Sequence, residues 1–415
     1  MTSKRTSRSI RVRATDGSGE FDAYLAVPAA GKGPGVVLAQ EIFGVNKTMR
    51  ELADYYAEEG YVVLVPDLFW RQEAGVELDE RTQFDRALAL YQGFDEAKGV
   101  DDIQATLNAL RALPEFAGQT GVLGFCLGGK LAYLAACSTD CDVAVAYYGV
   151  GIENALGEAD RLGGKRLVLH IAENDGFCPP EARDAILKAL SGRPGVDLYV
   201  YPGVDHAFAR LGGDHYHKPS ALMAHQRSIA AFRGVLGPHY DFSALWDKHC
   251  EYEFATRDVD ATMATMVAEP YVNHIPTMTG GVGYQLLSRF YRNHFVNANP
   301  PDTTLIPISR TVGSSQIVDE MLFCFTHTCE IDWMLPGVAP TGKRVEVPLI
   351  AIVKFRGDKL YHEHIYWDQA SVLVQIGKLD AKGLPVAGVE TARKLLDETL
   401  PSNTLMANWT KSEGR

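Results

Sequence analysis

The sequence has no long apolar run of the kind that crosses a membrane. No run reaches the roughly 18 to 20 residues needed to span a bilayer. The first residues, MTSKRTSRSIRVRATDG, are basic but lack the apolar core of a secretory signal. A weak organelle-targeting segment is one interpretation, but the alternation from Ile10 to Val12 favours a first strand. We therefore expect a cytoplasmic protein without a membrane partner.

Cysteine pairs and excess positive charge are also missing. The seven cysteines are odd in number and irregularly spaced, which excludes a disulfide framework, and none stands at zinc-finger spacing from another cysteine or a histidine. The net charge of −12 argues against binding to nucleic acid or to an anionic membrane. An anionic small molecule would need local arginines. We expect no nucleic-acid partner, no metal and no cofactor.

The composition that remains is that of a globular protein with more than one core. A chain of 415 residues is too long for one ordinary core. Its hydrophobic fraction of 46% and charged fraction of 22% are those of folded domains. The pattern of elements changes near Pro238, and no internal repeat is visible. We expect two domains, residues 1–238 and 239–415.

The first domain alternates strand-like and helix-like segments. Its continuous apolar runs are typical of strands buried on both faces; they are Gly35–Gln40, Tyr61–Pro66, Thr120–Phe125, Val143–Tyr148, Arg166–Ile171 and Asp197–Tyr201. Helical patterns lie near 47–59, 81–93, 98–113, 127–137, 181–192 and 217–236. This alternation predicts a doubly wound α/β sheet, with its active site at the carboxyl ends of the strands.

The second domain has helices first and strands afterwards. Amphipathic stretches near 242–254, 259–267 and 281–295 predict helices. Alternating stretches at 303–311, 314–331, 344–356 and 359–369 predict strands. Such an order is typical of a separate α+β domain.

Cys126 lies where a predicted strand ends and a helix begins. The run Gly124-x-Cys126-x-Gly128 is a G-x-S-x-G elbow with sulfur in place of oxygen. The following helix directs its N-terminus at the thiol, which stabilises a thiolate. A free cysteine is most often buried and inert, but the glycine turn at this switch favours a nucleophile.

The acid and the base of such a site should follow in chain order. Asp175 follows the Arg166–Ile171 strand, and His206 follows the Asp197–Tyr201 strand. Each alone could be a solvated loop residue, but their order and position agree with the elbow. We expect His206 to act as general base toward Cys126, and Asp175 to hold the imidazole tautomer.

An oxyanion hole needs two backbone N–H groups. Leu127, directly after the nucleophile, supplies one of them. The second should come from the loop after the Gly35–Gln40 strand, and the amide of Ile42 is the best candidate.

These segments closely resemble the dienelactone hydrolases, or carboxymethylenebutenolidases, over residues 8–236. The matching motifs are Gln40–Asn46 (QEIFGVN), Pro66-Asp67-Leu68, Gly124–Gly129 (GFCLGG), Tyr147–Val150 (YYGV) and His206–Arg210 (HAFAR). The resemblance implies hydrolysis of an unsaturated, carboxylated butenolide-type lactone, such as arises in the breakdown of chlorinated catechols. It also implies that Glu41 interacts with the nucleophile and helps to generate the thiolate when substrate binds. From chemistry alone, Glu41 could equally be a solvated loop carboxylate.

The resemblance further implies that arginines bind the substrate carboxylate. Arg210 matches one of them. The second should lie in 71–86, where the loop differs in length, and both Arg81 and Arg86 remain candidates. A guanidinium suits this task because it can bind a carboxylate through two parallel hydrogen bonds.

Residues 240–415 more loosely resemble the cone-shaped α+β fold of the nuclear-transport-factor-2-like group, which includes the SnoaL-like polyketide cyclases and ketosteroid isomerase. The segments that carry the resemblance are Tyr271–Pro276, Gly280–Phe295 and His362–Leu373. The polar residues that could face a pocket are His274, Asp332, Glu363, His364 and Asp368. The preferred interpretation is that they form structural hydrogen bonds or line a dimer surface, because function cannot be inferred from this fold alone. Alternation places Glu363 on the opposite face from His362 and His364. This histidine pair has no evident third metal ligand.

Three functions remain open. The preferred one is a cysteine hydrolase for a lactone or ester, in which the second domain serves assembly into a homodimer or shapes the substrate site. A bifunctional enzyme, whose second domain adds an isomerase or cyclase step, is the alternative. The third is a binding or scaffold protein on a hydrolase fold, and the complete set of Cys126, Asp175 and His206 argues against it.

Overall fold

The computed structural model describes residues 6–414. They form two compact units, one ending at His239 and the other beginning at Tyr240. Residues 1–5 and 415 of the predicted domains lie outside the described residues. Within residues 6–414, no helix is both long and apolar enough to cross a membrane.

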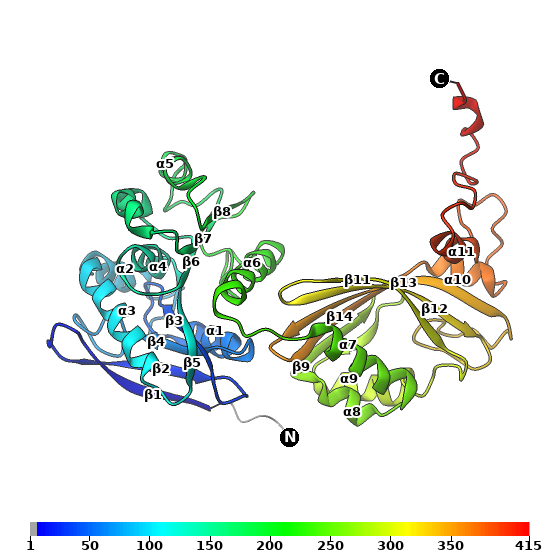
Figure 1. Cartoon of the computed structure of the whole chain (residues 1–415), viewed down its shortest axis with the longest axis horizontal. Helices are drawn as coiled ribbons and strands as arrows, with labels where there is room; N and C mark the ends of the chain where they lie inside the picture. The colour runs from blue at the N-terminus through cyan, green and yellow to red at the C-terminus, as the bar shows by residue number, and fades with distance from the viewer. Residues whose placement is uncertain (1–5, 415) are drawn as a thin grey trace. The chain divides into compact units, whose positions relative to one another are not determined.

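The first unit is built on an eight-stranded sheet (Figure 1). Its strands are β1 (Thr6–Arg13), β2 (Glu20–Val27), β3 (Gly33–Ala39), β4 (Val62–Pro66), β5 (Phe116–Phe125), β6 (Val143–Tyr147), β7 (Arg166–Ala172) and β8 (Val196–Tyr201). They lie in the order β1-β2-β4-β3-β5-β6-β7-β8. β2 pairs in antiparallel fashion with β1 and with β4. From β4 onward in this order, all neighbouring strands are parallel.

Helices cover both faces of this sheet, which is why its central strands are continuous apolar runs. They are α1 (Lys47–Glu58), α2 (Phe84–Gln92), α3 (Glu96–Arg111), α4 (Leu127–Ser138), α5 (Pro180–Leu190) and α6 (Lys218–Leu236), with a 3₁₀ segment at Ile152–Leu162. This confirms the predicted α/β-hydrolase sheet. The strand β2 was not predicted from the sequence. It is an antiparallel strand near the edge of the sheet, and its buried residues alternate with exposed ones.

The second unit contains a six-stranded mixed sheet in the order β10-β9-β14-β13-β12-β11. Its strands are β9 (Met266–His274), β10 (Thr279–Val282), β11 (Thr304–Val312), β12 (Gln316–Thr326), β13 (Arg344–Arg356) and β14 (Lys359–Trp367). Neighbours are antiparallel except β14 and β9. Alternate residues of β13, such as Val345, Val347 and Val353, are fully buried on one face.

The helices α7 (Phe242–Cys250), α8 (Val259–Ala264) and α9 (Tyr284–Phe290) lie along one face of that sheet (Figure 1). Two of them continue as π-helices, α7 into η2 (Glu251–Ala255) and α9 into η3 (Tyr291–Phe295). The C-terminal part adds α10 (Gln369–Gln375), α11 (Glu390–Leu396) and the 3₁₀ turn η4 (Thr410–Ser412). On the opposite face, α11 packs Ala392 against Leu322 and Cys324.

Two predicted helices of this unit were too long. The stretch 259–267 is helical only to Ala264, because Met266 already begins β9. The stretch 281–295 becomes helical only at Tyr284, because Thr279–Val282 pairs with β9 as a strand. In both places strand pairing overrides the helical pattern.

Candidate active site

The turn between β5 and α4 holds Cys126 in a strained conformation. Its φ of 56° lies in the left-handed region that non-glycine residues rarely adopt. The backbone N–H of Cys126 donates to Tyr147 O at 3.1 Å, which ties the turn to β6. The thiol side chain is buried, with 6% of the residue exposed. The structure therefore has the strained strand-to-helix turn of a nucleophile elbow.

Two glycines make this turn possible. A Cβ atom on Gly124 would lie 1.8 Å from Gly128 O, and one on Gly128 would lie 2.2 Å from Ala39 O. Gly128 N also donates to Gln40 O at 3.0 Å. The elbow is thus packed directly against the end of β3, where the QEIFGVN loop begins.

Asp175 and His206 come together beside the elbow. Asp175 follows β7, His206 follows β8, and Nδ1 of His206 lies 2.9 Å from Oδ2 of Asp175. Phe177 N donates to the other Asp175 oxygen at 2.8 Å, so both carboxylate oxygens are engaged. The two side chains are buried, at 6% and 4% exposure. The carboxylate fixes the proton on Nδ1 and leaves Nε2 as the atom that can exchange one.

The charge state of His206 depends on its neighbours. Burial alone lowers the pKa of His206, but contact with Cys126 and Asp175 raises it to about 10. The rings of Tyr148 and Phe177 pack edge-on against the imidazole, with centroids 5.0 and 4.9 Å away. The site therefore favours a protonated imidazole beside Cys126 and Asp175.

The amides of Ile42 and Leu127 occupy the two loops predicted to form the oxyanion hole. Leu127 is the first residue of α4, and Ile42 lies three residues after β3 ends. Within residues 6–414, neither of these N–H groups donates a backbone hydrogen bond of the loop, turn or cap type. The Gly128 N–Gln40 O bond joins the same two loops. Both amides thus stay available on loops that are hydrogen-bonded to each other.

Glu41 and Arg210 form a buried ion pair. Arg210 Nε lies 2.8 Å from Glu41 Oε2 and 3.4 Å from Glu80 Oε2. The other Glu41 oxygen, Oε1, is buried and has no hydrogen-bond partner among the residues that the structure describes. Burial alone lowers the pKa of Arg210, but Glu41 raises it above its usual range. The guanidinium also lies over the Phe43 ring, 5.1 Å from its centroid.

The two candidates for a second arginine are exposed and already paired. Arg81 Nη2 lies 2.9 Å from Asp214 Oδ1, and it also donates to the carbonyl of Gly212. Arg86 pairs with Glu73. Arg81 is therefore tied to the loop that follows Arg210, and Arg86 to the loop that precedes α2.

Tyr148 is a residue of this site that the pattern analysis quoted only as part of a motif. Its φ of 36° is unusual for a tyrosine, and its buried hydroxyl has no hydrogen-bond partner within residues 6–414. Burial raises the pKa of Tyr148 well above its usual value, and Glu41 and Cys126 raise it further. The Tyr148 hydroxyl is thus an unsatisfied donor beside the ionisable groups of Glu41, Arg210 and Cys126, which indicates a contact with a ligand. This signal is visible only in the structure.

The predicted pocket residues of the second unit do not all lie in one pocket. Among the predicted pocket acids and bases, His274 and Glu363 line a buried cavity. Asp368 instead caps α10, accepting from Ala370 N at 2.9 Å. Asp332 pairs with the partly exposed His294 at 2.7 Å. His364 faces the other side of the sheet, as alternation predicts, and stacks on His362 with ring centroids 4.4 Å apart.

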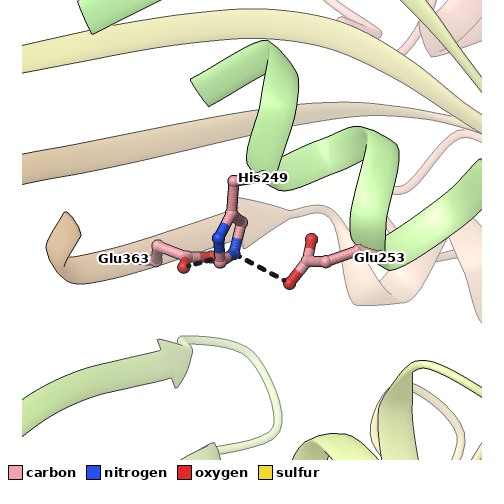
Figure 2. Close-up of side chains that lie close together, drawn as sticks. All are labelled: His249, Glu253 and Glu363. Atoms are coloured by element: carbon pink, nitrogen blue, oxygen red, sulfur yellow. Dashed lines mark hydrogen bonds and ion pairs between the residues drawn. The ribbon is translucent and has the colours of Figure 1, made fainter. Parts of the chain in front are cut away.

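Two of the cavity-lining residues, Glu253 and Glu363, belong to a charged cluster with His249 that the sequence pattern did not predict. Figure 2 shows His249 and Glu253 on one helical segment and Glu363 on β14. His249 Nε2 lies 3.1 Å from Glu253 Oε1 and 3.2 Å from Glu363 Oε1. Burial alone lowers the pKa of His249, but the two carboxylates raise it to about 10. The sequence signal was the i, i+4 spacing of His249 and Glu253 in the predicted helix 242–254.

Comparison with known proteins places the first unit in a family. The model of the Dienelactone hydrolase family matches residues 21–236. A protein of Azospirillum brasilense is 45% identical over 222 residues, which cover 53% of this chain and 95% of that protein. The carboxymethylenebutenolidase of Pseudomonas sp. strain P51 is 39% identical, with 51% of this chain and 90% of that protein covered.

Among solved structures, a dienelactone hydrolase-like promiscuous phosphotriesterase from metagenomic libraries is similar to the first unit. It is 22% identical with a TM-score of 0.48, and the match covers 56% of this chain and 99% of that chain. The family match and the curated relatives agree on the same half of the sequence. The chain belongs to the dienelactone hydrolase family through residues 21–236, and it is an ester or lactone hydrolase.

Proposed function

We propose that the first unit hydrolyses a carboxylated dienelactone through Cys126, His206 and Asp175. The observation that carries this proposal is the 2.9 Å contact of His206 with Asp175 beside a cysteine held at positive φ. A nucleophile, a base and an orienting acid in contact are the requirements of covalent acyl transfer.

The reaction has two steps. In the first, the Cys126 thiolate attacks the lactone carbonyl carbon, a C–S bond forms, the ring C–O bond breaks, and the leaving oxygen takes a proton from His206. In the second, His206 accepts a proton from water as the water attacks the thioester, and the thiolate leaves. The amides of Ile42 and Leu127 stabilise the oxyanion in both steps.

Glu41 and Arg210 make the site responsive to an anionic substrate. In the structure, Arg210 neutralises Glu41 at 2.8 Å. A substrate carboxylate that binds Arg210 competes for the same guanidinium and releases Glu41, which can then take the thiol proton of Cys126 and return it to the thiolate that leaves in the second step. Arg81 is the second arginine that we propose for the substrate, since its partners Gly212 and Asp214 lie in the loop after Arg210.

The test compares a carboxylated dienelactone with a neutral aryl ester. Wild-type protein should hydrolyse both, with a higher kcat/KM for the dienelactone, and Cys126→Ala should lose both activities. Cys126→Ser is the matched control because it keeps the shape of the side chain and a weak nucleophile. Hydrolysis of the dienelactone at the wild-type rate by Cys126→Ala would overturn the proposal.

For the second unit we propose the SnoaL-like, or nuclear-transport-factor-2-like, fold. A six-stranded sheet whose one face packs on α7, α8 and α9 around a small cavity supports this assignment. Pairing of two copies through this unit stays a prediction. Sedimentation of the full chain would decide between a monomer and a dimer.

A further inference from the structure

The buried cluster in the second unit has the geometry of a metal site. His249 Nε2, Glu253 Oε1 and Glu363 Oε1 all lie within 4.8 Å of one another, and the nitrogen is 3.1 and 3.2 Å from the two oxygens (Figure 2). An ion about 2.0 to 2.2 Å from each ligand atom keeps neighbouring ligand atoms roughly 3 to 3.5 Å apart. The two histidine–carboxylate spacings already fall in this range.

The histidine is oriented as a metal ligand by the residue behind it. His249 Nδ1 lies 2.6 Å from Thr265 Oγ1, and the Thr265 hydroxyl donates to the Thr262 carbonyl at 2.7 Å. The single hydroxyl proton of Thr265 is therefore used, so the imidazole must donate from Nδ1. This leaves Nε2, the atom that faces both carboxylates, with its lone pair in the neutral ring. Metal-binding histidines are commonly fixed in this way.

The charges of the cluster also favour a bound cation. His249, Glu253 and Glu363 are 0%, 2% and 3% exposed, and in the described part of the chain neither carboxylate forms an ion pair with a lysine or arginine. With a neutral imidazole and two ionised carboxylates, the cluster carries a net charge of −2, which is costly in a buried site. A divalent cation bound by a neutral imidazole and two carboxylates brings the sum to zero.

We propose that His249, Glu253 and Glu363 bind a divalent transition-metal ion of the Zn²⁺ class. An imidazole with two carboxylates suits Zn²⁺, Fe²⁺ or Mn²⁺, whereas Ca²⁺ and Mg²⁺ prefer oxygen ligands alone. The ligand Glu253 lies in the π-helical segment η2, and such segments are frequent at functional sites.

The cavity beside the two carboxylates offers room for a further ligand. Glu253, Glu363 and His274 all line it, and Nδ1 of His274 lies 3.2 Å from the Thr279 carbonyl, to which it can only donate. Burial lowers the pKa of His274 to about 4, so its Nε2 is a hydrogen-bond acceptor. The cavity leaves a volume of about 30 Å³ in which the centre of a water molecule can lie. A volume of about 10 to 15 Å³, defined in the same way, is enough to hold one water. The cavity thus suits metal-bound water, with three protein ligands as in open zinc sites.

The chain offers two matched controls. His362 and His364 stack on each other at 4.4 Å on the opposite face of β14, and they test whether a surface histidine pair binds the ion instead. Asp319 is a buried carboxylate of the same unit, 4% exposed, which Arg310 neutralises at 2.9 Å. Replacing it by asparagine changes a buried charge outside the cluster.

The experiment uses the full chain with Cys126→Ala, so that no reactive thiol binds metal in the first unit. The protein is freed of metal with a chelator and titrated with Zn²⁺ in competition with a chromophoric indicator. We expect one tight equivalent per chain. Glu253→Gln and Glu363→Gln should each weaken it at least about 100-fold, while the His362→Asn/His364→Asn and Asp319→Asn proteins keep it. Co²⁺ in place of Zn²⁺ should give an absorption spectrum that both glutamine variants lose.

Two results would overturn the proposal: no tight equivalent, or a tight equivalent that both glutamine variants retain. Circular dichroism shows whether each variant is folded. If the glutamine variants unfold, crystals of the zinc-soaked protein decide by anomalous diffraction at the zinc edge. A peak between the three ligand atoms supports the site, and a peak elsewhere or none contradicts it.

Discussion

Each of the two units buries a histidine in contact with at least one carboxylate, but the contacts come from different parts of the fold. In the first unit, His206 and Asp175 lie on loops after β8 and β7, next to a thiol. In the second, His249 contacts two glutamates from a helix and a strand inside the core. Both imidazoles have a pKa raised to about 10.

The difference lies in what the third group can do. Cys126 gives His206 a partner that exchanges protons and forms covalent bonds, so the site is built for chemistry on a substrate. The partners of His249 are both carboxylates, which accept but do not attack, and their joint charge favours a bound cation. A buried, charged histidine therefore indicates a functional site only together with the chemistry of its neighbours.

The largest expected effect separates the two histidines. His206→Asn should lower kcat/KM for the dienelactone by ~10⁴-fold, because the general base is lost. His249→Asn should leave this value unchanged within a factor of two to three. Steady-state kinetics on both variants, each checked for folding by circular dichroism, makes the comparison. Equal losses in the two variants would show that the sites are coupled.

The next effect concerns the backbone of the elbow. Gly124→Ala should destabilise the first unit by ~3 kcal/mol or more, because its Cβ would lie 1.8 Å from a backbone oxygen. Gly234→Ala in α6 is the matched control: its Cβ meets nothing within 4 Å, so it should stabilise by about 0.5 to 1 kcal/mol. Urea denaturation measures both. A neutral Gly124→Ala would contradict the close packing of the elbow.

A smaller effect tests the response to an anionic substrate. Arg210→Gln should raise KM for the carboxylated dienelactone by roughly 10- to 100-fold, since it removes a charge-assisted hydrogen bond. The neutral aryl ester should be affected less. The ratio of the two kcat/KM values reports the preference. An unchanged ratio would mean that Arg210 serves only to hold Glu41.

The smallest effect is a dependence of stability on pH. The pKa of His206 is about 10 when folded, above the usual 6.5. Its contribution to stability is therefore fully present below about pH 6.5 and is lost as the pH rises toward 10. Hydrogen exchange of α4 amides in wild-type protein should accelerate over this range more than in Asp175→Asn. Identical pH profiles would contradict the charged pair.

The sequence was most informative where residues follow strands. Parallel strands bring their carboxyl ends to one edge, so Cys126, Asp175 and His206 could be placed near one another without coordinates. The alternation along β14 likewise placed Glu363 opposite His362 and His364, as the burial pattern shows.

The sequence was less informative where contact depends on how elements pack. The approach of α7 to β14, which joins His249 to Glu363, leaves no periodic signal. Asp332 and Asp368 do not line the cavity; Asp332 pairs with His294, and Asp368 caps α10, which are the structural roles that were the alternative to a pocket role. Short strands such as β10 were hidden inside a helical pattern because their pairing partner is set by tertiary structure.

The order of the site residues along the chain has a consequence for synthesis. Every group assigned to the hydrolase site lies between Glu41 and Arg210, and the first unit is complete at His239. Domains generally fold as units, N-terminal first, while the ribosome is still extending the chain. The thiol pocket can therefore be assembled before the residues of the buried glutamate cluster have left the ribosome.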